Sequence, residues 1–167
     1  MYHEINLLDG RIFTTADVYQ KPYAIDATND QWQHLVWAFK DSGTKVGLYG
    51  LTRVPQNFIG DTSLVVVWNT TATTGVAAFE FRYRVVSGDD SASLDQAGQT
   101  QLQTGTDSAS ATANNQMQVS LSLTGSNFSV GATVEWFFAR DGTSIGDTLA
   151  ADVLLHGLFF KYSDNTV

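Results

Sequence analysis

Apolar and polar residues alternate through much of the chain, with the period of two that is typical of β-strands with one buried face. The segment 76–86, VAAFEFRYRVV, shows this most clearly. Its aromatic residues fall on one side of the expected strand, and Glu80, Arg82 and Arg84 fall on the other. The segment 117–123, MQVSLSL, alternates in the same way. Both are therefore expected to be strands with one face in a core and one face in water.

Further apolar runs are separated by turn residues, and none shows the period of a convincing amphipathic helix. Together the runs predict about eight strands. Besides the two above, the expected strands cover residues 32–39, 46–54, 61–70, 99–104, 132–140 and 153–162. Strands joined by turns, without helices, predict an all-β fold built as an antiparallel β-sandwich. Eight strands in two sheets favour a jelly-roll-like sandwich over a seven-stranded immunoglobulin-like one.

The first 30 residues show no sustained period and mix turn residues with single large apolar ones. This is consistent with an extended N-terminal arm that lies on another surface. It is equally consistent with an irregular lead-in packed on its own domain. We therefore divide the chain into an arm or lead-in over residues 1–30 and a β-sandwich domain over residues 31–167.

The chain is weakly charged for a globular protein, with 16% charged residues and a net charge of -8. Nucleic-acid recognition relies on clustered Lys and Arg, and only nine basic residues are spread over the chain. We therefore expect no nucleic-acid partner. The absence of cysteine excludes disulfides and thiolate metal sites. The longest apolar runs are too short to span a bilayer, so no membrane partner is expected.

The motif GTSIG contains Ser144 and matches the G-x-S-x-G nucleophile elbow of serine hydrolases, with Asp152 and His156 following in the order that these enzymes use. An elbow needs a strand, a sharp turn and a helix whose N-terminus helps to hold the oxyanion. Here the motif lies between two expected strands, and its partners are very close in sequence. We therefore expect a strand-to-strand loop, in which Gly142 and Gly146 permit positive φ angles, and no catalytic residues or enzymatic activity.

Acidic residues gather in two expected loops, without the spacing of an EF-hand calcium site. These residues are Asp89, Asp90 and Asp95 in one loop and Asp141, Asp147 and Asp152 in the other. The histidines are scattered and lack the paired spacing of a zinc site. They are His3, His34 and His156. We expect no metal and no bound cofactor.

The tryptophans are candidates for a sugar-binding platform, because carbohydrate-binding modules stack sugars on exposed aromatic rings. They are Trp32, Trp37, Trp68 and Trp136. All of them lie in strand-like runs, where packing in the core is the commoner fate of a large aromatic side chain. The pattern therefore favours a core role for the tryptophans over a sugar site.

Short motifs follow one another through the second part of the chain. They are Val54-Pro55, Trp68, Leu94-Asp95-Gln96-Ala97, Arg140-Asp141, Asp147-Thr148-Leu149-Ala150, Asp152, Leu154-Leu155, Gly157 and Tyr162. In this order, over about residues 54–162, the chain resembles a β-domain of tailed-phage virion proteins. His156 is a departure, because it interrupts the Leu-Leu-Gly run of that family.

The resemblance implies a jelly-roll-like domain without enzymatic activity, of the kind found in head decoration (cement) proteins, head fibres and tail fibres. The chain has no heptads and no shaft repeat, which favours a decoration protein. We therefore expect a phage structural protein on the outer capsid surface of the virion, a homotrimer that binds the major capsid protein and stabilises the head. The alternative is a glycan- or receptor-binding module of a tail or head fibre. The expected capsid or subunit contacts are Tyr2, Ile5, Leu7, Ile12, Phe13, Tyr19, Glu80, Arg82 and Arg84.

Overall fold

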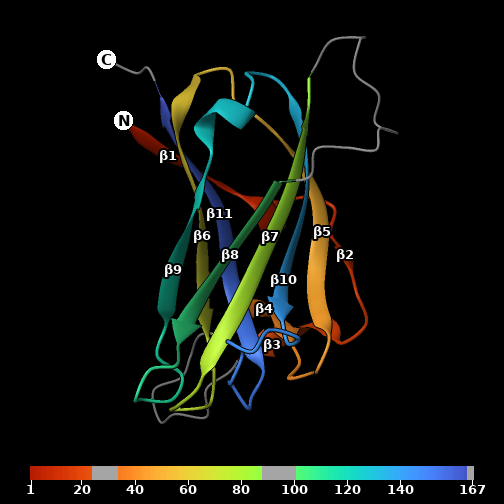
Figure 1. Cartoon of the computed structure of the whole chain (residues 1–167), viewed down its shortest axis with the longest axis vertical. Coiled ribbons are helices and arrows are strands. Elements are labelled where there is room, and N and C mark those ends of the chain that lie inside the picture. The colour runs from red at the N-terminus through yellow and green to blue at the C-terminus, as the bar shows by residue number, and fades with distance from the viewer. Residues whose placement is uncertain (24–33, 88–100, 165–167) are drawn as a thin grey trace.

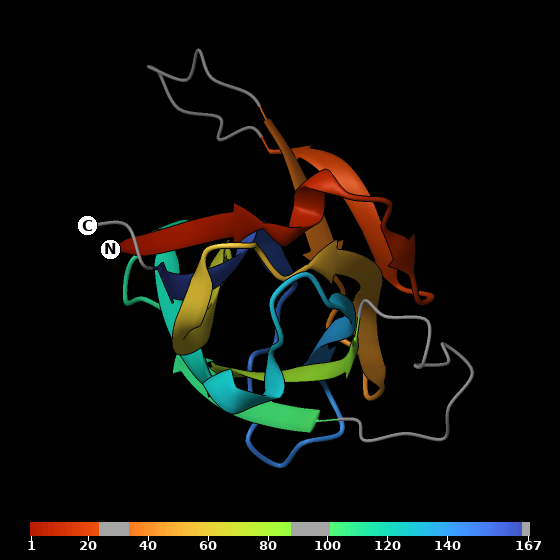
Figure 2. The same ribbon diagram turned by 90° about the horizontal axis from the view of Figure 1, so that it is seen from above.

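The computed structural model describes residues 1–23, 34–87 and 101–164, which form two β-sheets packed face to face (Figure 1 and Figure 2). Two short 3-10 helices, η1 (Leu7–Asp9) and η2 (Gly125–Asn127), lie between strands. The strands are β1 (Tyr2–Asn6), β2 (Phe13–Thr14), β3 (Val18–Tyr23), β4 (His34–Phe39), β5 (Lys45–Arg53), β6 (Phe58–Asn69), β7 (Val76–Val86), β8 (Gln101–Ser108), β9 (Met117–Leu123), β10 (Thr133–Asp141) and β11 (Val153–Asp164).

Each sheet is named here after its central strand. The β11 sheet has the order β3-β4-β11-β6-β9, and β1 pairs with the part of β11 that β4 does not reach. The β10 sheet has the order β2-β5-β10-β7-β8. All of these pairings are antiparallel. In the described ranges there is no α-helix, and none of the helices there is long and apolar enough to cross a membrane. The predicted all-β antiparallel sandwich is confirmed.

The described residues form eleven strands, where the pattern predicted about eight. The strands expected from the pattern correspond to β4 through β11, and the additional three come from the first 23 residues. There β1 pairs with β11, β2 with β5 and β3 with β4, and Leu7 and Val18 are buried in the core. Residues 1–23 thus adopt the second arrangement that the sequence left open, packing on their own domain. Their strands are short and held by backbone pairing, so they carry little apolar alternation.

Large apolar side chains fill the space between the sheets. Trp68 and Leu155 enter it from the β11 sheet, and Phe79 and Phe138 enter it from the β10 sheet; all four are buried. The rings of Phe79 and Phe138 stack with centroids 5.7 Å apart. Removal of this surface from water is the main favourable term in folding. The inward face of each strand is therefore committed to the core, and the outward faces are left for other roles.

The loop between β10 and β11, which contains GTSIG, is fixed by a buried arginine. Arg140 is fully buried, and its guanidinium donates hydrogen bonds to both carboxylate oxygens of Asp147, at 2.9 and 2.8 Å. A Cβ atom on Gly142 would lie 1.8 Å from the carbonyl oxygen of Ser42, so glycine there permits the close approach of two loops. Neither Gly142 nor Gly146 has a positive φ angle, so that prediction is wrong. At Gly142 the packing of the neighbouring loop, rather than the turn itself, demands a glycine, whereas a Cβ atom on Gly146 would make only ordinary contacts.

Candidate functional site

Exposed aromatic and aliphatic side chains from three neighbouring strands lie side by side on the outer surface of the β10 sheet. Tyr49 on β5 is the register partner of Phe13 on β2 and of Phe137 on β10. The rings of Tyr49 and Phe137 have centroids 4.4 Å apart. Phe13 is 70% exposed, Tyr49 is 47% exposed, and Leu51 is exposed beside them. We call Phe13, Tyr49, Leu51 and Phe137 the aromatic face.

The alternation of β10 explains why these side chains point outward. Trp136 and Phe138 are buried in the core, so Phe137 between them points to the opposite side of the sheet. On β5, two residues from its register partner Tyr49, a Cβ atom on Gly47 would lie 2.7 Å from the Phe137 ring. Glycine at this position therefore lets the ring lie against the backbone of β5.

Two hollows border the aromatic face and share Tyr49 and Glu135 as lining residues. One, of about 550 Å³, extends over β7 toward Lys45 and Arg82. The other, of about 630 Å³, extends toward β2 and Arg11. Both open on the same sheet and share lining residues, and we refer to these two adjoining hollows, with Tyr49 between them, as the groove.

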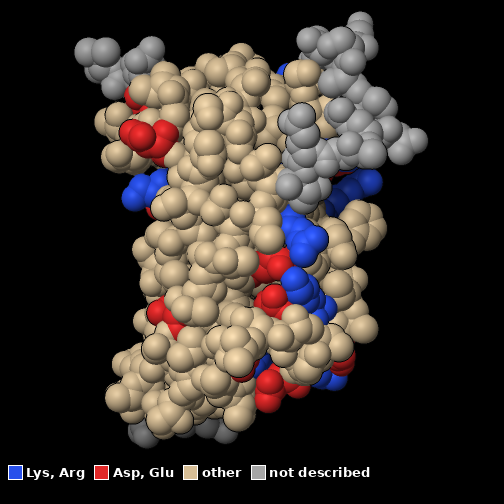
Figure 3. Space-filling view, in the orientation of Figure 1, with Lys and Arg blue, Asp and Glu red and all other residues tan. Residues whose placement is uncertain are grey.

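Charged side chains line the part of this groove that lies over β7. Figure 3 shows many of the charged atoms in that view gathered in one band over the β10 sheet. Glu80 accepts hydrogen bonds from Lys45 and from Nε of Arg82. Nε of Arg84 donates to Glu135 at 2.6 Å. The groove thus presents aromatic rings together with fixed hydrogen-bonding groups, which is the usual make-up of a small-molecule site.

Glu80 is only 2% exposed, although the alternation of its strand predicted a side chain in water. It does point to the outer side of β7, but Lys45 and Arg82 cover it there. Burial alone would raise the pKa of Glu80; the hydrogen bonds from Arg82 and Lys45 outweigh burial and lower this pKa below its ordinary value. The carboxylate is therefore charged at neutral pH and fixes both basic side chains in place.

The structure distributes the expected contact residues over several surfaces. Phe13, Glu80, Arg82 and Arg84 come together in or beside the groove. The remaining ones lie elsewhere: Tyr2 and Ile5 on β1, Leu7 in the core, Ile12 before β2 and Tyr19 on β3. Whether any of them contacts another subunit stays a prediction.

Five residues that the sequence pattern did not indicate complete the groove: Arg11, Tyr49, Leu51, Glu135 and Phe137. The last four occupy alternate positions in the two expected strands 46–54 and 132–140. A signal was therefore present, but the neighbouring positions are also apolar, and the sequence alone does not show which alternate set faces the core.

The tryptophans do not form the aromatic face. Trp68 and Trp136 are buried in the core, and Trp37 is partly buried against it. Trp32 lies outside the described residues. The preference for a core role is confirmed for Trp68 and Trp136, and the exposed rings are those of tyrosine and phenylalanine.

Ser144, Asp152 and His156 have separate hydrogen-bonding partners. The Ser144 hydroxyl accepts a hydrogen bond from the backbone N–H of Gly146 at 3.1 Å. Asp152 accepts one from the backbone N–H of Asp41 at 3.1 Å. His156 lies within β11 and is engaged by other side chains described below. Among the described residues no chain of hydrogen bonds links Ser144 to His156, so GTSIG matches the nucleophile elbow in sequence only.

The acidic residues of the β10–β11 loop are likewise engaged in protein contacts. Asp147 binds Arg140, and Asp141 accepts a hydrogen bond from the backbone N–H of Thr143 at 3.1 Å and pairs with Lys45 at 3.2 Å. Within the described ranges, no three His, Asp or Glu side chains come together as a metal site. The other candidate loop, with Asp89, Asp90 and Asp95, lies outside the described residues.

His156 belongs to a polar cluster between β11, β4 and β6. Its Nδ1 lies 2.8 Å from Nε2 of His34, and its Nε2 lies 3.0 Å from Oδ1 of Asn69. The ring of Tyr23 packs edge-on against it, with centroids 4.8 Å apart. Burial, and secondarily the charge of His34, lower the pKa of His156 to about 4. The imidazole is therefore neutral at physiological pH and acts as a hydrogen-bonding group within the sheet.

This cluster predicts a pH-dependent stability. The unfolded chain protonates His156 near its ordinary pKa of 6.5, whereas the folded chain does so only near about 4. The stability is therefore fully present above pH 6.5 and decreases as the pH falls toward 4. Between pH 7.5 and pH 5 we expect a loss of about 1–2 kcal/mol in the free energy of unfolding, because solvent screens a half-buried group in part; urea denaturation measures it. The His156→Gln variant should lose clearly less over the same range; an equal loss in both proteins would contradict the assignment.

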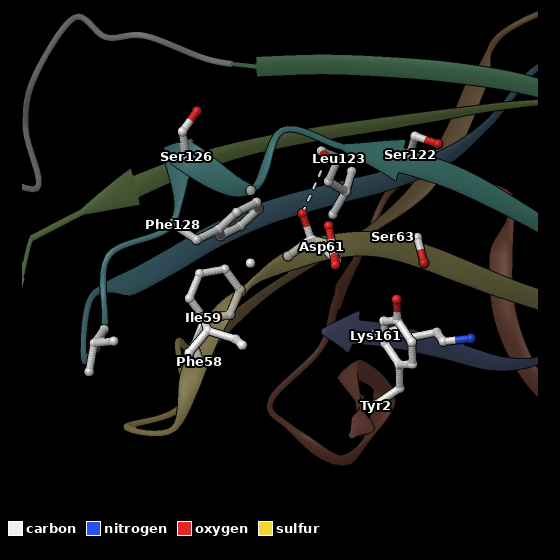
Figure 4. Close-up of a pocket in the computed structure, with 14 residues that line it drawn as sticks. Tyr2, Phe58, Ile59, Asp61, Ser63, Ser122, Leu123, Ser126, Phe128 and Lys161 are labelled. Atoms are coloured by element: carbon white, nitrogen blue, oxygen red, sulfur yellow. Dashed lines mark hydrogen bonds between the residues drawn. The ribbon is translucent and has the colours of Figure 1, made fainter. Parts of the chain in front are cut away.

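A further hollow lies at the end of the sandwich beside β1 and the last part of β11, on the β11 sheet (Figure 4). It measures about 1150 Å³ and is lined by residues of β1, β6, β9, η2 and β11. Figure 4 shows Tyr2 and Lys161 lying together on one side of it and Phe58 and Phe128 on the other, with Asp61 between them. Both phenylalanines are buried, and the Lys161 ammonium lies over the Tyr2 ring, 5.2 Å from its centroid. Lys161 thus covers one face of the Tyr2 ring and the two phenylalanines are buried, so this hollow offers fewer exposed rings than the aromatic face, which is the stronger candidate.

The fold is similar to those of carbohydrate-binding modules. The CBM22-1 xylan-binding domain of Paenibacillus barcinonensis Xyn10C matches with a TM-score of 0.51 and 13% identity, over 99% of this chain and 95% of that domain. A family 35 carbohydrate-binding module from Clostridium thermocellum matches with a TM-score of 0.50 and 11% identity, over 98% of both chains. The arabinose-bound α-L-arabinofuranosidase MgGH51 matches with a TM-score of 0.52 and 11% identity, over 90% of this chain but only 23% of the enzyme. At such identities the likeness is one of fold.

A scan against protein-family models and a search of the curated proteins found no match. The resemblance to phage virion domains, and with it the predicted role as a capsid decoration protein, is wrong, because the fold is instead similar to non-catalytic carbohydrate-binding modules. The motif residues near the C-terminus hold a loop, as the pairing of Arg140 with Asp147 shows. Such turn chemistry follows from local geometry and is a poor marker of function. The capsid partner, the homotrimer and the virion location followed from that resemblance, and the structure does not test them.

Proposed function

We propose that this chain is a non-catalytic glycan-binding module whose aromatic face holds sugars by stacking. The observation that carries the proposal is the row of rings from Phe13, Tyr49 and Phe137, which are register partners on three adjacent strands. The similarity of the fold to carbohydrate-binding modules supports the same reading.

The chemistry of the groove suits a carbohydrate. A sugar ring has apolar C–H faces that pack on aromatic rings and a rim of hydroxyls that need hydrogen-bond partners. Tyr49 and Phe137 supply the rings, and Glu135 and Arg82 in the same groove supply acceptor and donor groups. Neighbouring strands lie about 4.8 Å apart, so rings on three strands span about 10 Å, which is enough for more than one sugar unit. The platform is built on strands rather than loops, which keeps it pre-organised.

The test is a glycan array probed with the purified chain, followed by calorimetric titration of the best ligand with variants. Tyr49→Ala should raise the Kd by about 10- to 100-fold, because it removes the central ring of the groove. Tyr2→Ala is the matched control, since it deletes an exposed tyrosine on the other sheet, beside Lys161. That variant should bind like the unaltered chain.

The two variants separate the possible results. Loss of binding in Tyr2→Ala but not in Tyr49→Ala would move the sugar site to the hollow at the end of the sandwich. An array without a specific glycan signal would overturn the proposed function itself.

A further inference from the structure

We propose that the aromatic face selects glycans that carry oxyanion groups, carboxylate or sulfate, and that Arg82 and Arg11 recognise these groups. This inference rests on the proposed function, because it names the ligand class of the same groove. It follows from the charges and the free hydrogen-bond donors around the rings, which a purely neutral sugar would not need.

The groove is basic although the chain is acidic. The chain has nine Lys and Arg against 17 Asp and Glu, a net charge of -8. The described residues that line the two hollows of the groove reverse this balance. They include Arg11, Lys45, Arg82 and Arg84 but only Glu80 and Glu135 as acids. Glu80 and Glu135 neutralise two of these four cations, which leaves a net charge of +2 among the lining residues, and Asp141 outside the hollows also pairs with Lys45. Arg11 and the outer part of Arg82 are therefore the positive groups that face the ligand.

Arg82 is placed to hold an oxyanion next to the rings. Its side chain is 45% exposed, and Phe137 is its register partner on β10. The hydrogen bond to Glu80 uses Nε, and within the described part of the chain the two terminal amino groups have no hydrogen-bond partner. Two parallel N–H groups of one guanidinium match the two oxygens of a carboxylate, or two oxygens of a sulfate. Glu80 therefore fixes the side chain while its outer fork remains available.

Arg11 lies at the opposite end of the same groove. It lines the hollow beside Phe13 and has no hydrogen-bond partner among the described residues. Arg11 and Arg82 thus line the two different hollows that Tyr49 borders. A glycan stacked along the row would bring ring substituents to either end, and acidic substituents would meet a cation at both. We infer an acidic oligosaccharide rather than a single charged sugar.

The experiment compares charged glycans with matched neutral ones by calorimetric titration of the whole chain. One pair is an oligogalacturonate and the same oligosaccharide with its carboxylates reduced to primary alcohols. The other pair is dextran sulfate and dextran. We expect the charged member of at least one pair to bind about tenfold more tightly, and which pair shows the effect distinguishes carboxylate from sulfate.

Variants assign the selectivity to its residues. Arg82→Gln should remove most of the preference for the charged glycan and weaken the binding of its neutral counterpart much less, because glutamine still supplies a hydrogen-bond donor for a hydroxyl. Arg11→Gln should act in the same direction, and it serves as the second test if Arg82→Gln disturbs folding by leaving Glu80 with Lys45 alone. Lys161→Gln is the matched control, since it removes one positive charge from the other sheet and should keep the full preference.

The outcomes distinguish the inference of an acidic ligand from the proposed glycan-binding function on which it rests. If neutral glycans bind and charged ones bind no better, the glycan-binding proposal stands and the inference of an acidic ligand fails. The inference also fails if Arg82→Gln and Arg11→Gln retain the full preference. If no glycan of any kind binds, both fail together.

Discussion

Replacement of Arg140 by methionine should lower the free energy of unfolding by about 3–5 kcal/mol, since breaking a buried ion pair leaves an uncompensated charge. Arg140 is fully buried, and Asp147, which accepts two of its hydrogen bonds, is nearly so. The same guanidinium donates to the backbone carbonyl oxygens of Leu149 and Ala151. Methionine fills much of the space but satisfies none of these acceptors.

Urea denaturation of the variant and of a matched control measures this effect. Arg53→Met is suitable, because Arg53 is an exposed arginine on the neighbouring strand β5 that donates to the carbonyl oxygen of Gly131. It should cost less than about 1 kcal/mol. If both variants lost a similar amount of free energy of unfolding, the buried ion pair would contribute no more to stability than an exposed arginine does.

The alternation of apolar residues was sufficient to predict the sandwich. In β7 the inward residues Phe79, Phe81 and Tyr83 are all buried, as the period of two requires. This rule is reliable because a shift of one residue in the register would move every inward apolar side chain of the strand into water, at a large cost in free energy. The same rule could not find β1 and β2, which bury little and are held through backbone hydrogen bonds to β11 and β5.

The candidate site was harder to predict, because it depends on which strands become neighbours. Tyr49 and Phe137 are far apart in sequence and meet only because β5 pairs with β10. Phe13 joins them from a two-residue strand without a pattern of its own. Glu80 shows that alternation does not predict exposure. Its pattern correctly placed the side chain on the outer side of the sheet, but the burial of Glu80 depends on Lys45 and Arg82, which cover it. The hydrophobic pattern predicts the side of the sheet on which a side chain lies, whereas the make-up of a site also depends on which strands pair and in what register.

Trp68→Ala should also cost about 3–5 kcal/mol, as expected for a large aromatic side chain removed from a core. Trp68 is fully buried on β6, and its ring packs edge-on against Phe79 of the other sheet, with centroids 5.5 Å apart. Its indole N–H donates to Asp107 on β8 at 2.9 Å. The side chain therefore joins the two sheets by packing and by a hydrogen bond to a carboxylate.

Two companion variants divide this effect, and both are measured by urea denaturation. Trp68→Phe keeps part of the packing and deletes the hydrogen bond, so it should fall between the unaltered chain and Trp68→Ala. Tyr49→Ala deletes an aromatic ring from the outer surface of the β10 sheet and should cost less than about 1 kcal/mol while it weakens glycan binding. If Tyr49→Ala instead destabilised the fold as much as Trp68→Ala, the exposed rings would be structural, and the separation between an inner face that holds the sheets together and an outer face that binds sugars would not hold.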